Sequence, residues 1–401
     1  MSNEKVLFLL NRGTGMSPYS HQFMPEEIDP QILSGFISAI TSFMDEATGP
    51  ETTHLQTVDS SDTSFLLDEG DWIIGVLSVS RETNEARSKL RRVVREFEEQ
   101  FAVLKNADGF EASMFKDFDK FVMDLFLSDR ISERTLILKG WDWPKFYRSF
   151  DVPSESLGVN KFLNQAEDKQ SIKEVAQSQG LTLDEAINFA SIAFWKNALY
   201  LNYVPSDNDI LALSEGSSTI LFRKENPLEL SPGTVRILGS LDGRRPLSLS
   251  LKMLGGKSVE RVLLELGSLA NRGYLQNISL ERRLVLVNEC VLSQFFQVCA
   301  QAMGAGKATK SLYAAIEAKV EANPWTSRIR LVEGSIGHSA IDVSMTPADL
   351  EALSAAIEIL TDDLEKELGG VTGQSNAESM LLSVRKHCRE SWRPYIGIAF
   401  F

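Results

Sequence analysis

The order of strand-like and helix-like segments over residues 1–128 constrains the fold of this chain more than any other feature. "KVLFLL" and "PYSHQF" flank a turn-rich stretch, which predicts a β-hairpin. A helix is predicted for residues 26–46, with Asp29 as its N-cap and Pro30 at its first position. The segments that follow predict three strands and then two amphipathic helices, over residues 53–59, 64–69, 72–80, 84–104 and 113–127. The predicted order is therefore ββαβββαα.

This order, together with the phrase "EEIDPQILSGFISAITSF" after the first two strands, resembles the longin and roadblock-like domains. The phrase itself is similar to the first helix of prokaryotic longin-like proteins. The resemblance covers residues 4–128 and implies a platform for small GTPases, or a trafficking or polarity module, without catalytic residues of its own. A small Ras-like GTPase is the partner that it implies.

The predicted helix 26–46 carries no charge between Pro30 and Met44, although a helix face in water normally carries Lys and Glu. Its non-apolar positions in this stretch are Ser34, Gly35, Ser38, Thr41 and Ser42. Such small side chains let another backbone approach with little loss of side-chain entropy. We therefore predict that these five residues bind a partner, either a GTPase or a second copy of the chain. The alternative is that later domains of the same chain cover them.

The chain of 401 residues is long enough for two to four domains. We predict an α+β multidomain protein with a longin-like β-sheet and flanking helices, two winged-helix-like domains and a helical C-terminal domain. The predicted boundaries are 1–128 for the longin/roadblock-like domain, 129–150 for a linker, 151–224 and 225–288 for the winged-helix-like domains, and 289–401 for the mainly helical domain.

The two winged-helix-like domains are predicted from the arrangement of helices, turns and strands. Two capping boxes, Ser171 with Glu174 and Thr182 with Glu185, predict the starts of consecutive helices in the first domain. "LNYV" and "DILALS" are expected to form its hairpin, and "LQNIS" and "LERRLVLV" the wing of the second domain. In the C-terminal domain, helices are expected to end at the double glycine 369–370 and before Pro394.

The charge of the chain is unevenly distributed. The formal net charge is −14, which argues against a molecule that binds nucleic acid over its whole surface. Residues 151–222 carry four Lys/Arg against ten Asp/Glu, a balance of −6, whereas residues 236–283 carry nine against four, a balance of +5. DNA binding through 225–288 is therefore the alternative function, with the phosphate-facing residues Arg244, Arg245, Lys252, Lys257, Arg261, Arg282 and Arg283. Glu265 can instead pair with Arg261 at i, i+4, which favours a solvated or protein-facing surface.

The chain lacks recognisable catalytic and metal-binding motifs. "GAGKAT" at 304–309 departs from a phosphate-binding loop, because Ala308 follows Lys307 where Ser or Thr is required. Three cysteines without C-x-x-C spacing are typical of buried thiols in a reducing cytoplasm, and the four histidines form no ligand cluster. No stretch approaches the roughly 18 consecutive apolar residues of a membrane span. We predict no cofactor, no metal and no catalytic residues.

Together these observations predict a non-enzymatic cytoplasmic adaptor or regulator that acts through protein–protein binding. Its expected partner is a small Ras-like GTPase of a polarity, motility or trafficking system, and self-association as a homodimer is also considered. A DNA-binding transcriptional regulator that uses residues 225–288 is the competing hypothesis.

Overall fold

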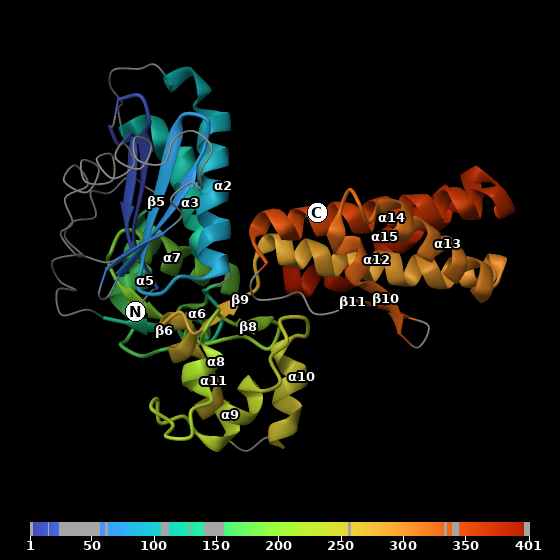
Figure 1. The fold of residues 1–401 in the computed structure, drawn as a ribbon. Coiled ribbons are helices and arrows are strands. Elements are labelled where there is room, and N and C mark those ends of the chain that lie inside the picture. Colours follow the sequence, from blue (N-terminus) through green and yellow to red (C-terminus); the bar gives the residue numbers. More distant parts are fainter. Residues whose placement is uncertain are drawn as a thin grey trace. The chain divides into compact units, whose positions relative to one another are not determined.

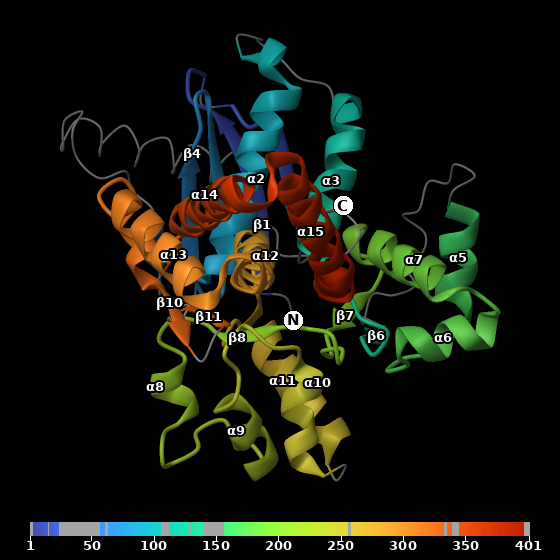
Figure 2. The same ribbon diagram turned by 90° about the vertical axis from the view of Figure 1, so that its right-hand side faces the viewer.

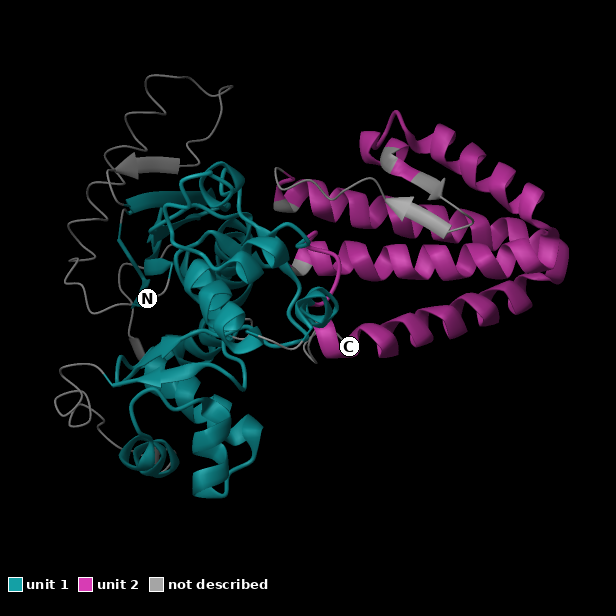
Figure 3. Ribbon diagram, turned by 90° about the horizontal axis from the view of Figure 1, so that it is seen from below, with its two compact units in different colours: residues 1–241, 247–277 teal, residues 242–246, 278–401 magenta. Residues whose placement is uncertain are grey.

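The computed structural model describes residues 3–14, 16–23, 57–60, 63–105, 112–127, 130–139, 156–255, 258–332, 335–338 and 345–396. The predicted helix 26–46 lies outside these residues. The chain divides into two compact units, which are described separately below (Figure 3). Unit 1 contains residues 1–241 and 247–277, and unit 2 contains residues 242–246 and 278–401.

Unit 1 begins with a five-stranded antiparallel sheet in the order β2-β1-β5-β4-β3 (Figure 1). The predicted first hairpin is confirmed, because β1 pairs with β2, and the three later strands are also present. Strand β1, which lies between β2 and β5, is buried on both faces, which explains its uninterrupted apolar run. The strands are β1 Glu4–Asn11, β2 Tyr19–Gln22, β3 Thr57–Ser60, β4 Thr63–Glu69 and β5 Ile73–Val79.

Two helices, α2 Asn84–Gln100 and α3 Lys116–Leu127, cover one face of this sheet, as the helical periodicity predicts (Figure 1). The Thr83 hydroxyl caps α2 by accepting a hydrogen bond from the Ala86 N–H at 3.1 Å. Short 3₁₀ segments, η1 Ala102–Leu104 and η2 Ala112–Phe115, lie between the two helices. A Cβ atom on Gly75 would overlap with Val94, so the missing side chain lets α2 lie directly on β5.

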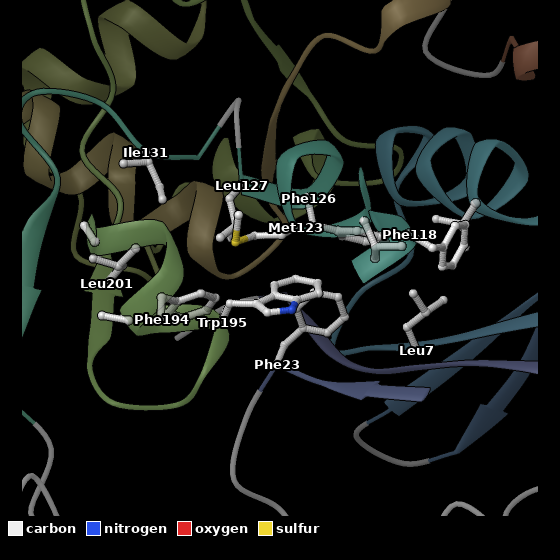
Figure 4. Packing of buried hydrophobic residues seen from close by; sticks show 14 of the residues in the cluster. Leu7, Phe23, Phe118, Met123, Phe126, Leu127, Ile131, Phe194, Trp195 and Leu201 are labelled. Carbon is white, nitrogen blue, oxygen red and sulfur yellow. The ribbon is translucent and has the colours of Figure 1, made fainter. Parts of the chain in front are cut away.

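The sheet and the segment after it share one hydrophobic core rather than two. The cluster that begins at Leu7 in β1 continues through α3 to Trp195 and Leu201 (Figure 4). Part of the predicted linker 129–150 belongs to this fold, since Ile131 is buried and residues 136–138 form a strand. Three helices follow in the chain, α5 Ser156–Gln165, α6 Ile172–Gln179 and α7 Leu183–Trp195, and with the strands beside them they are called the first three-helix module. The sheet and this module therefore form one packing unit.

A polar cluster of side chains also joins the sheet to this module. The Asp119 carboxylate on α3 accepts hydrogen bonds from the Tyr19 hydroxyl and the Trp195 indole N–H, both at 2.9 Å. Burial, together with the adjacent Asp119 carboxylate, raises the pKa of Tyr19. The His21 ring lies flat against the Trp195 indole, with ring centroids 3.4 Å apart. Hydrogen bonds and stacking thus fix α7 against β2 and α3.

The first three-helix module has a β-α-α-α-β arrangement in which the outer strands pair with each other. Both predicted capping boxes are confirmed, and Gly180 ends α6 in the left-handed conformation with φ 67°. Its elements are β6 Leu136–Leu138, α5 Ser156–Gln165, α6 Ile172–Gln179, α7 Leu183–Trp195 and β7 Tyr200–Asn202.

The second module repeats this arrangement further along the chain (Figure 2). The shift is 75 positions from Leu136 to Leu211 and again from Asn202 to Asn277, residues that occupy the same places in the two strand pairs. An additional short helix, α8 Ser218–Leu221, follows β8. The other elements are β8 Leu211–Leu213, α9 Pro232–Leu238, α10 Leu247–Leu251, the 3₁₀ segment η3 Lys252–Leu254, α11 Val259–Asn271 and β9 Leu275–Asn277.

Two predicted strand pairings in this region are wrong. "LNYV" and "DILALS" do not form a hairpin, because β7 pairs with β6 and β8 pairs with β9. "LERRLVLV" is no wing strand but the first two turns of helix α12, Leu280–Met303. The Ser279 hydroxyl caps this helix. Its buried apolar positions continue with helical spacing through Leu292 and Phe295, so the short alternation of Leu and Val wrongly predicts a strand.

Unit 2 is built from long helices and one hairpin (Figure 2). Helix α12 packs against α14 and α15, and the buried side chains of the unit include Phe295, Leu353 and Leu364. The remaining elements are α13 Ala305–Lys319, η4 Pro324–Arg328, β10 Ile329–Val332, β11 Ser335–His338, α14 Pro347–Thr372 and α15 Gln374–Ile396.

The predicted helix ends in unit 2 are wrong. Helix α14 continues through the double glycine 369–370 to Thr372, and α15 contains Pro394 near its end. A glycine inside a helix costs only about 1 kcal/mol relative to alanine, and packing of the fully buried Leu364 and Leu368 offsets that cost.

Among the described residues, one helical stretch, Glu281–Met303, is long and apolar enough to cross a membrane, with a mean hydropathy of 1.2. Half of that stretch is buried inside the structure, as in the core helix of a water-soluble protein.

Candidate functional site

The residues predicted to bind a partner, Ser34, Gly35, Ser38, Thr41 and Ser42, lie outside the described part of the chain. The seven basic residues of the DNA alternative do not all belong to one unit. Arg244, Arg245, Arg282 and Arg283 belong to unit 2, whereas Lys252 and Arg261 belong to unit 1. Lys257 also falls outside the described residues.

Three of the basic residues in unit 2 are buried or are bonded to groups near the buried part of that unit. The Arg244 guanidinium donates a hydrogen bond to the carboxylate of Glu289, a buried residue of α12. Burial raises the pKa of Glu289 to about 7, against the opposing effect of the Arg244 charge. Arg282 is buried, and the Arg283 Nε donates to the carbonyl oxygen of Ile278 at 3.0 Å.

The other described members of the set, Arg245, Lys252 and Arg261, are exposed. Arg245 pairs with Asp242 at 3.2 Å, and Lys252 is exposed on η3. The predicted i, i+4 pair on α11 is confirmed, because the Arg261 Nε lies 2.8 Å from a carboxylate oxygen of Glu265. The Ser231 N–H and the Thr234 hydroxyl also donate to Glu265. This carboxylate therefore ties α11 to the start of α9.

A large open groove lies between the two three-helix modules of unit 1, and sequence reasoning did not predict it. Its cavity volume is about 920 Å³. The first module contributes β6 and the start of α6, and the second contributes the start of α11. The groove is lined by Glu133, Arg134, Leu136, Lys169, Ser171, Lys173, Glu174, Val204, Ser258, Val259, Glu260, Arg261, Leu263 and Leu264.

Apolar side chains from both modules contribute to the lining of the groove. Leu136 and Val204 come from the strands of the first module and the segment after them, and Leu263 from α11. Leu264, also on α11, is 39% exposed. Beside the buried Val204 and Leu263, this exposed leucine provides a contact point for an apolar side chain of a partner.

The charged side chains in the groove have both signs. Arg134 pairs with Asp207 at 3.2 Å, and Lys173 pairs with Glu133 at 3.4 Å. Hydrogen bonds from Ser171, through its backbone N–H and its hydroxyl, lower the pKa of Glu174, so this carboxylate is ionised at neutral pH. The four cationic residues of the lining face three acidic ones, which leaves little net charge to attract a polyanion.

The groove contains no histidine or cysteine, and the described residues include no group of three or more His, Cys, Asp or Glu side chains that could hold a metal ion. Apolar positions and ionised side chains of both signs favour a protein segment as the ligand. No local pattern in the sequence predicts this site, because its walls combine Glu133, Arg134 and Leu136 with residues at the start of α11 that lie more than 100 positions further along the chain.

Comparison of the chain with models of known protein families, and with curated protein sequences, gives no match.

Proposed function

We propose that the protein is a non-enzymatic cytoplasmic adaptor or regulator that acts through protein–protein binding. The groove between the two three-helix modules carries this proposal, since it offers apolar side chains beside charged residues of both signs. A partner segment that alternates apolar and charged side chains is complementary to such a lining.

The proposed partner is a small Ras-like GTPase, on the basis of the resemblance of residues 4–128 to longin and roadblock-like domains. The antiparallel order β2-β1-β5-β4-β3, with α2 and α3 on one face, supports this part of the proposal. An adaptor of this kind would act on the switch loops of the GTPase without supplying a catalytic group.

The DNA alternative has less support. Arg244 is held by Glu289 and Arg282 is buried, so neither side chain is presented to phosphates in the way that the predicted wing requires. The exposed residues Lys252 and Arg261 are the members of the predicted set in unit 1 that could contact a polyanion.

The test combines partner identification with two matched variants. The tagged protein is incubated with extract that is loaded with GDP or with a non-hydrolysable GTP analogue, and captured GTPases are then purified for calorimetric titration. Leu264→Glu places a charge in the groove, whereas Leu249→Glu makes the same change at a residue of α10 that is 45% exposed and does not line the groove. We expect Leu264→Glu to weaken binding at least about 10-fold, equivalent to about 1.4 kcal/mol, and Leu249→Glu to leave it unchanged.

Equal affinity of the wild type and the Leu264→Glu variant would exclude the groove as the docking site. Capture of DNA alone, with affinity that falls steeply as salt is raised, would instead favour the DNA alternative.

A further inference from the structure

Two of the three cysteines lie in contact across a helix pair in unit 2. Cys290 is on α12 and Cys388 is on α15, and their Sγ atoms are 3.2 Å apart. Cys388 is fully buried, whereas Cys290 is half-buried. The two atoms would have to approach by only about 1 Å to reach the length of a disulfide bond. The pair thus consists of one half-buried cysteine and one fully buried cysteine whose sulfur lies within reach of it.

The surroundings of Cys290 favour its thiolate form. Hydrogen bonding with the Cys388 thiol is the largest cause of the lowered pKa of Cys290. The Trp392 side chain, the charge of His387 and the Gln294 amide also lower this pKa, whereas partial burial opposes them. The same contact, together with burial, raises the pKa of Cys388. A thiolate that accepts a hydrogen bond from a neighbouring thiol is the arrangement of an attacking cysteine beside a resolving cysteine.

Cys299 provides an internal comparison on the same helix. It is fully buried, and burial raises its pKa to about 11. It therefore has the properties of an inert structural thiol, which the sequence predicts for all three cysteines.

We propose that Cys290 and Cys388 form an oxidation site that reacts with hydroperoxides and closes a reversible disulfide between α12 and α15. The Cys290 thiolate attacks the distal oxygen of a hydroperoxide, the O–O bond breaks, and the departing alkoxide or hydroxide takes up a proton to leave as an alcohol or as water. Cys290 is then a sulfenic acid. The Cys388 sulfur attacks the Cys290 sulfur, the S–O bond breaks, and the hydroxide leaves as water with the Cys388 proton. Two thiols lose two electrons in total, and the peroxide gains them.

The disulfide would join the first and last long helices of unit 2, which are separated by most of the unit's sequence. A cross-link that closes so long a loop restricts the unfolded chain strongly and so stabilises the folded unit. Disulfides in a reducing cytoplasm are usually transient, so the expected modification is reversible and responds to the peroxide level.

The experiment uses the full-length protein with hydrogen peroxide as the probe. After brief treatment with a small molar excess, free thiols are blocked with N-ethylmaleimide under denaturing conditions, and peptides are mapped by mass spectrometry without reduction. We expect a peptide pair linked through Cys290 and Cys388, alkylated Cys299, and loss of the link on reduction with dithiothreitol. In the native protein, alkylation of Cys290 should be at least about 10-fold faster than that of Cys299 at pH 7.

Three single variants separate the roles of the thiols. Cys388→Ser should accumulate a sulfenic acid at Cys290 that dimedone traps, Cys290→Ser should leave Cys388 reduced, and Cys299→Ser should oxidise like the wild type. In the wild type, oxidation should raise the thermal midpoint of unit 2 by roughly 5–15 °C.

Peptide mapping of the wild-type protein tests by itself whether peroxide links Cys290 to Cys388, so the test does not depend on the folding of any variant. Oxidation of Cys299 at the same rate as Cys290, disulfides formed only between molecules, or retention of both thiols under peroxide would each overturn the proposal.

Discussion

His21 provides a direct test of how the sheet and the first three-helix module are joined. Its ring is parallel to the Trp195 indole to within 5°, at a centroid distance of 3.4 Å. Burial and, to a smaller extent, the positive charge of Lys196 lower the pKa of His21 to about 3. The ring therefore stays neutral in the folded protein at pH 5, whereas in the unfolded chain it is protonated below about pH 6.5.

The sign of the pH dependence follows from these two states. Below about pH 6.5 the unfolded chain binds more protons than the folded protein, so the free energy of unfolding falls as the pH falls. Each pH unit between the unfolded pKa and pH 5 contributes about 1.36 kcal/mol, which sets an upper value of about 2 kcal/mol. Because the ring is half-buried rather than fully buried, water screens part of this effect, and we expect a loss of about 1–2 kcal/mol from pH 7 to pH 5.

His21→Phe preserves an aromatic ring for stacking on Trp195 and removes the titrating nitrogens. Urea unfolding of both proteins at pH 7 and pH 5 gives the difference in pH dependence, which cancels the contribution of other titrating groups. Proton NMR of the four histidines gives an independent measurement, in which the His21 signal is identified by its absence from the variant. A His21 signal that titrates near pH 6.5, or an equal loss of stability in both proteins, would refute the stacked and shielded ring.

Two further predictions concern close packing and a buried ion pair. A Cβ atom on Gly267 of α11 would overlap with the carbonyl oxygen of Tyr203. Gly267→Ala should therefore lower the free energy of unfolding of unit 1, measured in urea titrations, by about 1–3 kcal/mol. Gly306→Ala is the control, because a Cβ atom there meets no other atom and the change should be neutral or stabilising. The Arg130 guanidinium forms an ion pair with the carboxylate of Glu4, whose side chain is 2% exposed. Arg130→Ala should lower the free energy of unfolding by about 3 kcal/mol in thermal or urea unfolding, because it leaves a buried charge without its partner. A decrease below about 1 kcal/mol would show that water solvates the pair.

The sequence predicts well those features that depend on neighbouring residues. The hairpin of β1 and β2, the capping boxes at Ser171 and Thr182, and the pair of Arg261 with Glu265 are each set by residues a few positions apart. These features depend on turn formation, on the capping of free N–H groups and on contacts between side chains four positions apart on a helix. All three effects act between residues that are close in the sequence. Local signals were therefore sufficient for these features.

The strand pairings of the modules could not be predicted in the same way. Strands β6 to β9 have three residues each, which is too short for a recognisable alternation, and their partners lie more than 60 positions away. "LNYV" and "DILALS" lie close together in the sequence, and this proximity is what predicts their pairing. In the structure each strand closes a different module, because β7 pairs with β6 across three helices and β8 pairs with β9 across four.

These pairings also explain why the groove between the modules has defined walls. Since each module is closed by its own strand pair, only residues 203–210 connect the two, and this short connection is held at several points. Gly267 packs against the Tyr203 backbone, the Asn271 amide donates to the Asn202 side chain at 2.8 Å, and the Ser132 hydroxyl donates to the Val204 carbonyl at 2.5 Å. A groove whose walls are fixed in this way before binding loses little conformational entropy when a partner docks. A partner segment should therefore bind with little rearrangement of the modules, and the affinity should depend mainly on the side chains that line the groove.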